Sequence, residues 1–285
     1  MLETIILKIL ILLQGFGAAS GLVYHKNQLY IVADDKAMIF RYDFTTKNQE
    51  NFPLETVIPI SEMKKKDKLD LESIIYHKNH IYTLGSGSKE NRNDFHVLNL
   101  KKNSTNRYDV SDLYQTLRNQ FNISAKDFNI EGFAFHKGKT YLFNRGNGEN
   151  KLNGIFIFGG KPNEASLKKV VFVPIYLPII NGNLTTFSDA IIINNEIIFT
   201  ATIEDKSTVQ KDGEVKESII GRINLKDFKV DKFHIIAKNR KIEGLTLFKE
   251  TKEDYKFLLC EDNDDDSSES KIYQLQISKD FDLLK

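Results

Sequence analysis

Residues 129–147 read NIEGFAFHKGKTYLFNRGN, and this pattern occurs five times along the chain. The other copies begin at Ala18, Asp70, Thr186 and Lys241. An acidic or hydroxyl residue stands near the start of every copy, and these column residues are Ser20, Glu72, Glu131, Ser188 and Glu243. They are 52, 59, 57 and 55 residues apart. Such a period, with β-type apolar runs, is typical of β-propeller blades.

The apolar runs predict an all-β fold, a single β-propeller domain over residues 1–285 with five four-stranded blades. Four copies open with two strands joined by a turn that tolerates positive φ, at Lys26-Asn27, Lys78-Asn79, Lys137-Gly138 and Asn194-Asn195. The runs are mostly continuous rather than alternating, as expected where both faces of a blade are buried. In blade one the outermost strand is expected at residues 54–60 (LETVIPI).

The fifth repeat has only three apolar runs before the chain stops. The unassigned run at residues 5–12 (IILKILIL) is therefore expected to supply the fourth strand of blade five. This pairing would close the ring and leave no open edge between the first and last blades.

Blade two departs from the pattern after its third strand. Residues 109–121 (DVSDLYQTLRNQF) carry Leu113, Leu117 and Phe121 at a spacing of four and predict a short helix. This helix either covers a rim of the ring or replaces an outer strand. Residues 63–68 (MKKKDK) are expected to form a solvated loop, with a basic contact patch as the alternative.

The composition sets limits on location and partners. The chain has 40 Lys+Arg against 39 Asp+Glu, so its overall charge predicts neither nucleic acid nor a membrane as partner, although local clusters could still act. A single cysteine, Cys260, suits a reducing, cytoplasmic compartment. Residues 4–19 imitate a signal peptide, but Glu3 and Lys8 are atypical of one, so a secreted or periplasmic location is the alternative.

The column residues are expected to meet at one mouth of the central channel, because the first strand of each blade lines it. Three carboxylates would then converge there and call for a compensating cation, so Glu72, Glu131 and Glu243 are the candidate ligands of Ca²⁺ or Mg²⁺. Arg145 is a second compensator, and Glu131 and Arg145 are the candidate catalytic residues. A small polar ligand would be bound by a wider set of residues: Ser20, Asp34, Asp35, Arg145, Ser188 and Asp189. The alternative is that the column residues hydrogen-bond to the neighbouring blade.

Three repeated histidines, His25, His77 and His136, resemble a metal-binding set at first sight. Each lies five residues after its column residue, beside the hairpin turn, about 16 Å away at the usual strand rise. We therefore predict that they support the turns.

The blade openings ASGLVYHKNQLYIVADD, NIEGFAFHKGKTYLFNRGN and KIEGLTLF resemble repeats of an uncharacterised bacterial propeller family related to the esterase-like domain of phytase. More loosely they are similar to gluconolactonase and regucalcin propellers. That second resemblance implies a divalent metal on channel carboxylates, here Glu72, Glu131 and Glu243, and six blades in place of five.

Three hypotheses for function follow. The leading one is a propeller that binds a small polar molecule or a divalent cation at the channel mouth. A metal-dependent hydrolase acting on a lactone or phosphoester is the second, and a protein-binding platform that uses the rim is the third. Whether the protein is an enzyme stays open at this point.

Overall fold

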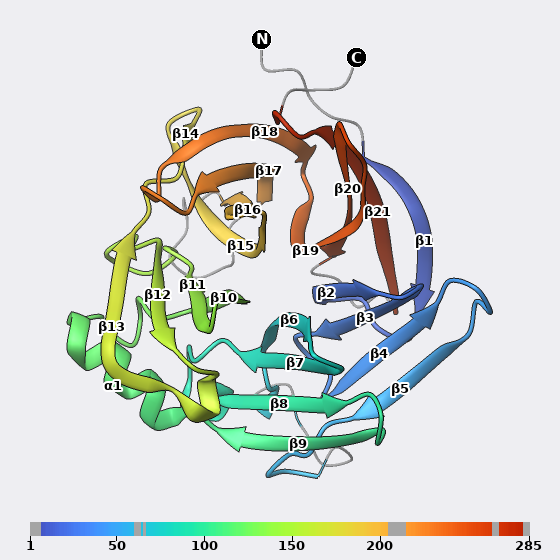
Figure 1. Ribbon diagram of the computed structural model, residues 1–285, viewed down its shortest axis with the longest axis horizontal. Coiled ribbons are helices and arrows are strands. Elements are labelled where there is room, and N and C mark those ends of the chain that lie inside the picture. The colour runs from blue at the N-terminus through green and yellow to red at the C-terminus, as the bar shows by residue number, and fades with distance from the viewer. Residues whose placement is uncertain (1–6, 60–63, 65–66, 205–214, 264–267, 282–285) are drawn as a thin grey trace.

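Five antiparallel sheets surround a common axis (Figure 1). They are seen in a computed structural model that describes residues 7–59, 64, 67–204, 215–263 and 268–281. The chain enters most blades at the strand nearest the axis and then runs outward. The prediction of a five-bladed β-propeller is confirmed, and the count of six blades implied by the looser resemblance is wrong.

Each of the first three blades consists of four consecutive strands. Blade one contains β2 (Ala19–His25), β3 (Gln28–Ala33), β4 (Met38–Asp43) and β5 (Gln49–Pro53). Blade two contains β6 (Leu71–His77), β7 (His80–Gly85), β8 (Asp94–Asn99) and β9 (Ser104–Asp109). Blade three contains β10 (Ile130–His136), β11 (Lys139–Asn144), β12 (Gly154–Gly159) and β13 (Ser166–Pro174).

The last two blades are completed differently. Blade four contains β15 (Asn183–Ile193), β16 (Glu196–Glu204), β17 (Val215–Asn224) and β18 (Val230–Lys238), with the two-residue β14 (Ile179–Ile180) paired to the start of β15. Blade five contains β19 (Lys241–Glu250), β20 (Asp254–Asp262), β21 (Glu269–Ser278) and, from the other end of the chain, β1 (Lys8–Gln14).

The N-terminal strand closes the ring, as predicted. β1 pairs antiparallel with β21 from Lys8 opposite Gln274 to Gln14 opposite Glu269 and forms the outer edge of blade five (Figure 1). The strand begins three residues later than expected, and residues 5 and 6 lie outside the described part of the chain. Leu13 is buried together with Phe16 and Ile272, which fixes β1 on the blade.

The outer strand of blade one was predicted wrongly, and the outer strand of blade two decides between two alternatives. Residues 54–59 form no strand, and the outer strand of blade one is the polar segment β5, QENFP. Blade two has an outer strand, the polar β9, so the predicted helix does not replace it and the alternative that it covers a rim agrees with the structure. Both strands are largely exposed, and burial therefore does not impose on them the apolar pattern that marks inner strands.

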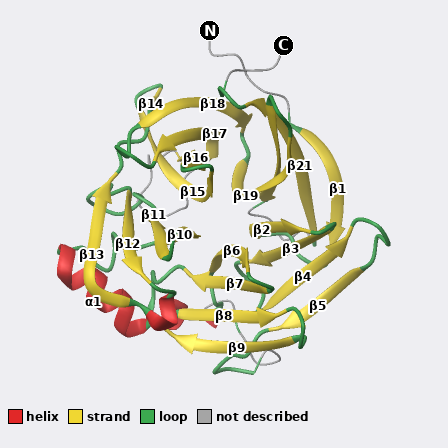
Figure 2. Cartoon of the chain, in the orientation of Figure 1, coloured by secondary structure: helices red, strands yellow, loops and turns green. Residues whose placement is uncertain are grey.

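The helix α1 (Ser111–Phe121) follows β9 and lies at the rim between blades two and three (Figure 2). Leu113, Tyr114 and Leu117 form its buried face. The Tyr114 hydroxyl donates a hydrogen bond of 2.7 Å to the carbonyl oxygen of Gly85, at the end of β7. Two short 3₁₀ turns, η3 (Glu90–Arg92) and η4 (Pro162–Glu164), complete the regular structure of the described residues.

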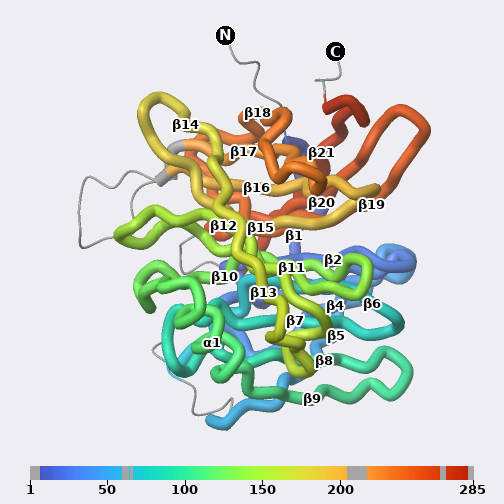
Figure 3. The backbone as a smooth tube through the Cα atoms, turned by 60° about the vertical axis from the view of Figure 1, so that its left-hand side comes forward, coloured from blue at the N-terminus to red at the C-terminus, as the bar shows by residue number. Residues whose placement is uncertain are grey.

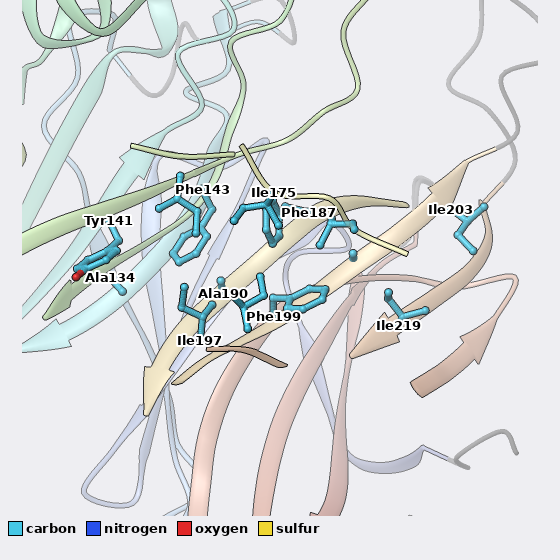
Figure 4. Packing of buried hydrophobic residues seen from close by; sticks show 14 of the residues in the cluster. Ala134, Tyr141, Phe143, Ile175, Phe187, Ala190, Ile197, Phe199, Ile203 and Ile219 are labelled. Atoms are coloured by element: carbon cyan, nitrogen blue, oxygen red, sulfur yellow. The ribbon is translucent and has the colours of Figure 1, made fainter. Parts of the chain in front are cut away.

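The blades are held together by apolar side chains that interlock between neighbouring sheets. Figure 4 shows this packing between blades three and four. The ring of Phe187 contacts Phe143 at 5.7 Å and Phe199 at 5.5 Å between centroids, both edge to face. Burying a phenylalanine of this kind contributes about 1.5–3 kcal/mol. The continuous apolar runs of the inner strands are explained by this packing on both faces.

Among the described residues, no helix has the length and apolar character needed to cross a membrane.

Candidate functional site

Every innermost strand carries a β-bulge at its column residue. In β10, Ile130 pairs with Asn144 and Gly132 with Phe143, so Glu131 has no partner across the strand. The same register shift occurs in β2, β6, β15 and β19, at Ser20, Glu72, Ser188 and Glu243. A bulge of this kind re-aims a side chain away from the regular alternation of a strand. We call the end of the ring where the bulges lie the mouth.

The bulges bring three carboxylates together, as the sequence predicted. Glu72, Glu131 and Glu243, from blades two, three and five, each place one carboxylate oxygen within 4.8 Å of the other two. We call these three residues the inner group. Glu131 and Glu243 are 2% and 1% exposed, and Glu72 is half-buried.

Both buried members of the inner group have one oxygen held and one oxygen unused. Glu131 Oε1 accepts hydrogen bonds from Asn129 Nδ2 at 2.6 Å and from Arg145 Nη1 at 3.1 Å. Glu243 Oε1 lies 2.9 Å from Lys241 Nζ, an ion-pair contact, but accepts no hydrogen bond among the described residues. The second oxygen, Oε2, of each glutamate is buried and has no hydrogen-bond partner among the described residues. The Oε2 atoms of Glu131 and Glu243 could therefore each accept a hydrogen bond or bind a cation.

The electrostatics of the inner group favour neutralisation. Burial and the charges of Glu131, Asp70 and Glu243 raise the pKa of Glu72 well above its ordinary value. Burial also raises the pKa of Glu131 to about 7, because the charge of Glu243 adds to the effect and Arg145 only partly opposes it. Glu72 and Glu131 therefore hold a proton more readily than free glutamates do, unless a cation compensates their charge.

A second group of acids lies next to the first. Asp34, Asp70 and Glu72 also have carboxylate oxygens within 4.8 Å of one another, and we call them the outer group. The two groups share Glu72. Lys68 Nζ forms an ion pair with Asp34 and lies 3.5 Å from Asp70 Oδ1. Arg92 Nη1 lies 2.7 Å from Asp70 Oδ2.

Several residues of this region were missed in the sequence. Lys68 was expected in a solvated loop but is half-buried, so that prediction is wrong for this residue. Asp70, Asn129 and Lys241 each stand two positions before a column glutamate, in DLE, NIE and KIE. This repeated polar position is a signal that could have identified all three.

Other predicted site residues join neighbouring blades. The Ser20 hydroxyl donates to the carbonyl oxygen of Leu71, and the Ser188 hydroxyl donates to that of Ile242 at 2.7 Å. Asp189 Oδ2 accepts from the Leu245 amide at 2.8 Å, and burial raises its pKa well above the ordinary value. These contacts correspond to the alternative of hydrogen bonding between blades.

The two aspartates that follow β3 are separated by the structure. Asp34 belongs to the outer group, whereas the side chain of Asp35 is 45% exposed and pairs with Lys36 at 3.1 Å. Asp35 is thus not brought to the carboxylates of either group.

The three repeated histidines lie at the hairpin turns, as predicted. His25 stacks on Tyr76 with 3.5 Å between ring centroids, and His77 meets Phe135 edge to face at 5.5 Å. His136 Nε2 lies 3.2 Å from Asn195 Oδ1. Each histidine therefore contacts the turn region of the next blade.

Fold and site together define a five-bladed β-propeller with buried carboxylates gathered at its mouth. The chain belongs to the Family of unknown function (DUF6929), whose model matches residues 15–277. A comparison with curated proteins gives no significant match. The resemblance to phytase-related and gluconolactonase propellers is thus confirmed only as far as the fold.

Solved structures similar to this chain include propellers of different kinds. The major allergen Mala s 1 of Malassezia sympodialis is 12% identical, with a TM-score of 0.56 over 92% of this chain and 93% of that one. Glutaminyl cyclase of Myxococcus xanthus is 10% identical, with a TM-score of 0.55 over 97% and 99%. A glycosyl hydrolase from Bacteroides ovatus is 9% identical, with a TM-score of 0.50 over 92% and 85%. At these identities the similarity shows the fold alone.

Proposed function

We propose that the protein binds a divalent cation, Ca²⁺ or Mg²⁺, through Glu72, Glu131 and Glu243. The observation that carries this proposal is the pair of unused, buried oxygens, Glu131 Oε2 and Glu243 Oε2. Buried polar atoms in folded proteins are nearly always paired, and an unpaired one calls for an explanation such as an ion.

Charge balance supports a cation. Three ionised carboxylates face two positive charges, those of Arg145 and Lys241, so the ionised group has a net charge of about −1. Bound protons or a cation can compensate that charge. Carboxylate oxygens are the ligands that Ca²⁺ and Mg²⁺ prefer, and three carboxylates from three blades can surround a small ion.

A small ion suits the site better than an organic molecule. Glu131 and Arg145 are 2% and 6% exposed, and a bulky ligand would have to displace the side chains around them. Cavities of about 320 Å³ and 430 Å³ open beside Arg107 and beside Lys238, and no inner-group carboxylate lines either of them. A polar ligand at the mouth would therefore contact Glu72, because it is the only half-buried member of the inner group.

Metal-dependent hydrolysis is the second candidate, because a buried carboxylate, that of Glu131, and a buried guanidinium, that of Arg145, lie 3.1 Å apart beside the proposed cation site. A carboxylate next to a bound cation could take a proton from the attacking water. In this version Glu131 is the base and Arg145 holds the developing anion. Binding without catalysis remains our leading proposal, because both side chains are nearly inaccessible.

The test is metal analysis of the purified protein together with thermal melts in Ca²⁺, in Mg²⁺ and in EDTA. A ligand present at 100 times its Kd stabilises the folded state by about 2.7 kcal/mol. We expect this gain in the wild type and its loss in Glu131→Gln, whereas Glu149→Gln, at an exposed glutamate, should retain it. A melt that is indifferent to all three conditions, with no metal copurifying, would refute the proposal.

A further inference from the structure

The end of the ring opposite the mouth is built from hairpin turns. In each of blades one to three, the turn after the first strand contacts the turn after the third strand. The amides of Phe44, Leu100 and Gly160 donate to the carbonyl oxygens of Asn27, Asn79 and Gly138 at 2.8, 3.1 and 3.1 Å. Figure 3 shows the β8–β9 and β19–β20 turns on the right and α1 on the left. We call residues 25–28, 43–49, 77–80, 99–104, 136–139 and 159–165 the hairpin face.

The hairpin face is strongly basic. It contains two carboxylates, Asp43 and Glu164, against eight lysines: Lys26, Lys47, Lys78, Lys101, Lys102, Lys137, Lys139 and Lys161. Subtracting these from the totals of 40 basic and 39 acidic residues leaves 32 basic and 37 acidic residues elsewhere. The chain is close to neutral overall because the basic hairpin face of blades one to three offsets an acidic remainder.

These lysines are available to a partner. Seven of them are exposed, and Lys161 is half-buried with its Nζ 5.3 Å from the centre of the Tyr82 ring. Among the described residues, none of the eight forms an ion pair with a carboxylate. Lysines elsewhere do so, for example Lys68, Lys241 and Lys279. The positive charge of the hairpin face is thus uncompensated within the molecule.

The neighbouring histidines report the same field. Burial, then the charges of Lys78, Lys161 and His80, lower the pKa of His77. Burial and the charge of Lys26 lower the pKa of His25. Burial is the larger cause for both rings, and the charges of the neighbouring lysines act in the same direction, as expected where lysines cluster.

The residue types of the hairpin face indicate which class of partner it can bind. All its basic residues are lysines, which act as point charges and lack the planar fork by which arginine recognises nucleic-acid phosphates and bases. The exposed large apolar side chains of the described residues, such as Ile9, Val57 and Tyr176, lie on other segments. The face therefore offers neither a stacking platform for bases nor an apolar anchor for a protein interface.

We infer that the hairpin face of blades one to three docks on an anionic phospholipid surface. A bilayer that contains phosphatidylserine attracts clustered lysines without demanding a fixed contact geometry. The total charge predicted no such partner, but only charges within a Debye length, about 8–10 Å, act on the surface. Docked in this way, the protein turns its mouth and the inner group toward the solution.

The test is sedimentation with vesicles of phosphatidylcholine alone and with added phosphatidylserine. We expect binding only to the phosphatidylserine vesicles, and its loss when the ionic strength rises from about 0.1 to 1 M, which shortens the Debye length from about 10 to 3 Å. The triple variant Lys26→Glu, Lys78→Glu, Lys137→Glu should lower vesicle partitioning by at least about tenfold. The matched control Lys89→Glu, Lys151→Glu, Lys238→Glu makes the same charge change at exposed residues of the mouth end and should bind as the wild type does.

Three results would overturn the inference. The first is a wild type that ignores phosphatidylserine. The second is a control variant that loses as much binding as the hairpin variant, because vesicle binding would then depend on the net charge of the protein and not on this face. The third is tighter binding to duplex DNA than to vesicles at equal salt, abolished by the hairpin variant, which would make the face a nucleic-acid site. Circular dichroism of both variants shows whether each is folded.

Discussion

The inner and outer groups are adjacent, share Glu72 and have the same spacing of carboxylate oxygens, yet they differ in how their charge is balanced. In the outer group, Lys68 and Arg92 pair with Asp34 and Asp70, and the Ser86 hydroxyl also donates to Asp70. In the inner group, Arg145 and Lys241 reach one oxygen of each buried glutamate and leave the other oxygen unused.

This difference shows that clustering of acids does not by itself define a cation site. The charge of the outer group is balanced by Lys68 and Arg92, so we expect this group to stabilise the fold and not to bind an ion. The inner group has unused acceptors in a buried place, so we expect it to bind an ion. Single substitutions in the two groups should therefore affect stability and cation affinity differently.

Removing a side-chain cation from the outer group should cost the most. Arg92→Met leaves Lys68 as the remaining cation beside the buried carboxylate of Asp70, and breaking a buried ion pair costs about 3–5 kcal/mol. Urea denaturation measures this loss. Lys126→Met, which removes an exposed ion pair with Glu149, should leave the midpoint unchanged. Equal midpoints for both variants would show that the outer group needs no cation.

The inner group should make stability fall as pH rises in the absence of a cation. The pKa of Glu131 is about 7 in the folded protein against 4.5 ordinarily, so the unfolded chain releases this proton first and the folded state loses stability between about pH 4.5 and 7. The shift corresponds to about 3 kcal/mol. A saturating cation should reverse the slope, because it binds the ionised form.

The measurement is urea denaturation at pH 5 and pH 8, in EDTA and in Ca²⁺. The histidines also titrate in this range, so the Glu131 contribution is the difference between the wild type and Glu131→Gln. In EDTA, the free energy of unfolding of the wild type should fall relative to that of Glu131→Gln as the pH rises. If it rises instead, the carboxylates of the inner group do not repel one another in the folded protein.

Loss of the hydrogen bond that orients Glu131 should weaken cation binding without removing a ligand. Asn129 Nδ2 donates to Glu131 Oε1 at 2.6 Å, and residues that orient ligands in this way typically contribute 10–100-fold to affinity. Isothermal titration calorimetry of Asn129→Ala should show this loss, with Asn106→Ala, at an exposed position of β9, as the control. Equal affinities in the two variants would argue against the orienting role.

The smallest effect is expected from Asp34→Asn. Its carboxylate is already paired with Lys68, so cation affinity should stay within about threefold of the wild type. The same titration checks this. An affinity loss as large as that of Asn129→Ala would mean that the two groups form one site and that the comparison fails.

The sequence predicts the repeat, the number of blades and the meeting of the glutamates, because all three depend on inner strands. Inner strands are buried on both faces, which leaves a regular apolar pattern with one polar column. The column residues align in the sequence because the bulge recurs at the same position of each repeat, as at Glu131 and Glu243.

Two kinds of feature could not be predicted. The outer strands β5 and β9 are polar because little of their surface is buried, so no apolar run marks them. The cations of the outer group are brought to the mouth by segments that lie outside the repeated pattern: Arg92 by the 3₁₀ turn η3 and Lys68 by the segment before β6. Their positions depend on the path of the connections and not on periodicity.

The closure of the ring by β1 has a mechanical consequence. β1 starts and β21 ends at the same end of blade five, because the two strands are antiparallel and Lys8 lies opposite Gln274. A force applied between Lys8 and Ser278 would break the backbone hydrogen bonds between β1 and β21 one after another, beginning at that end of the ladder. Peeling needs far less force than shearing a whole ladder at once. Under such a force, the pairing of β1 with β21 should therefore be the first part of the propeller to open.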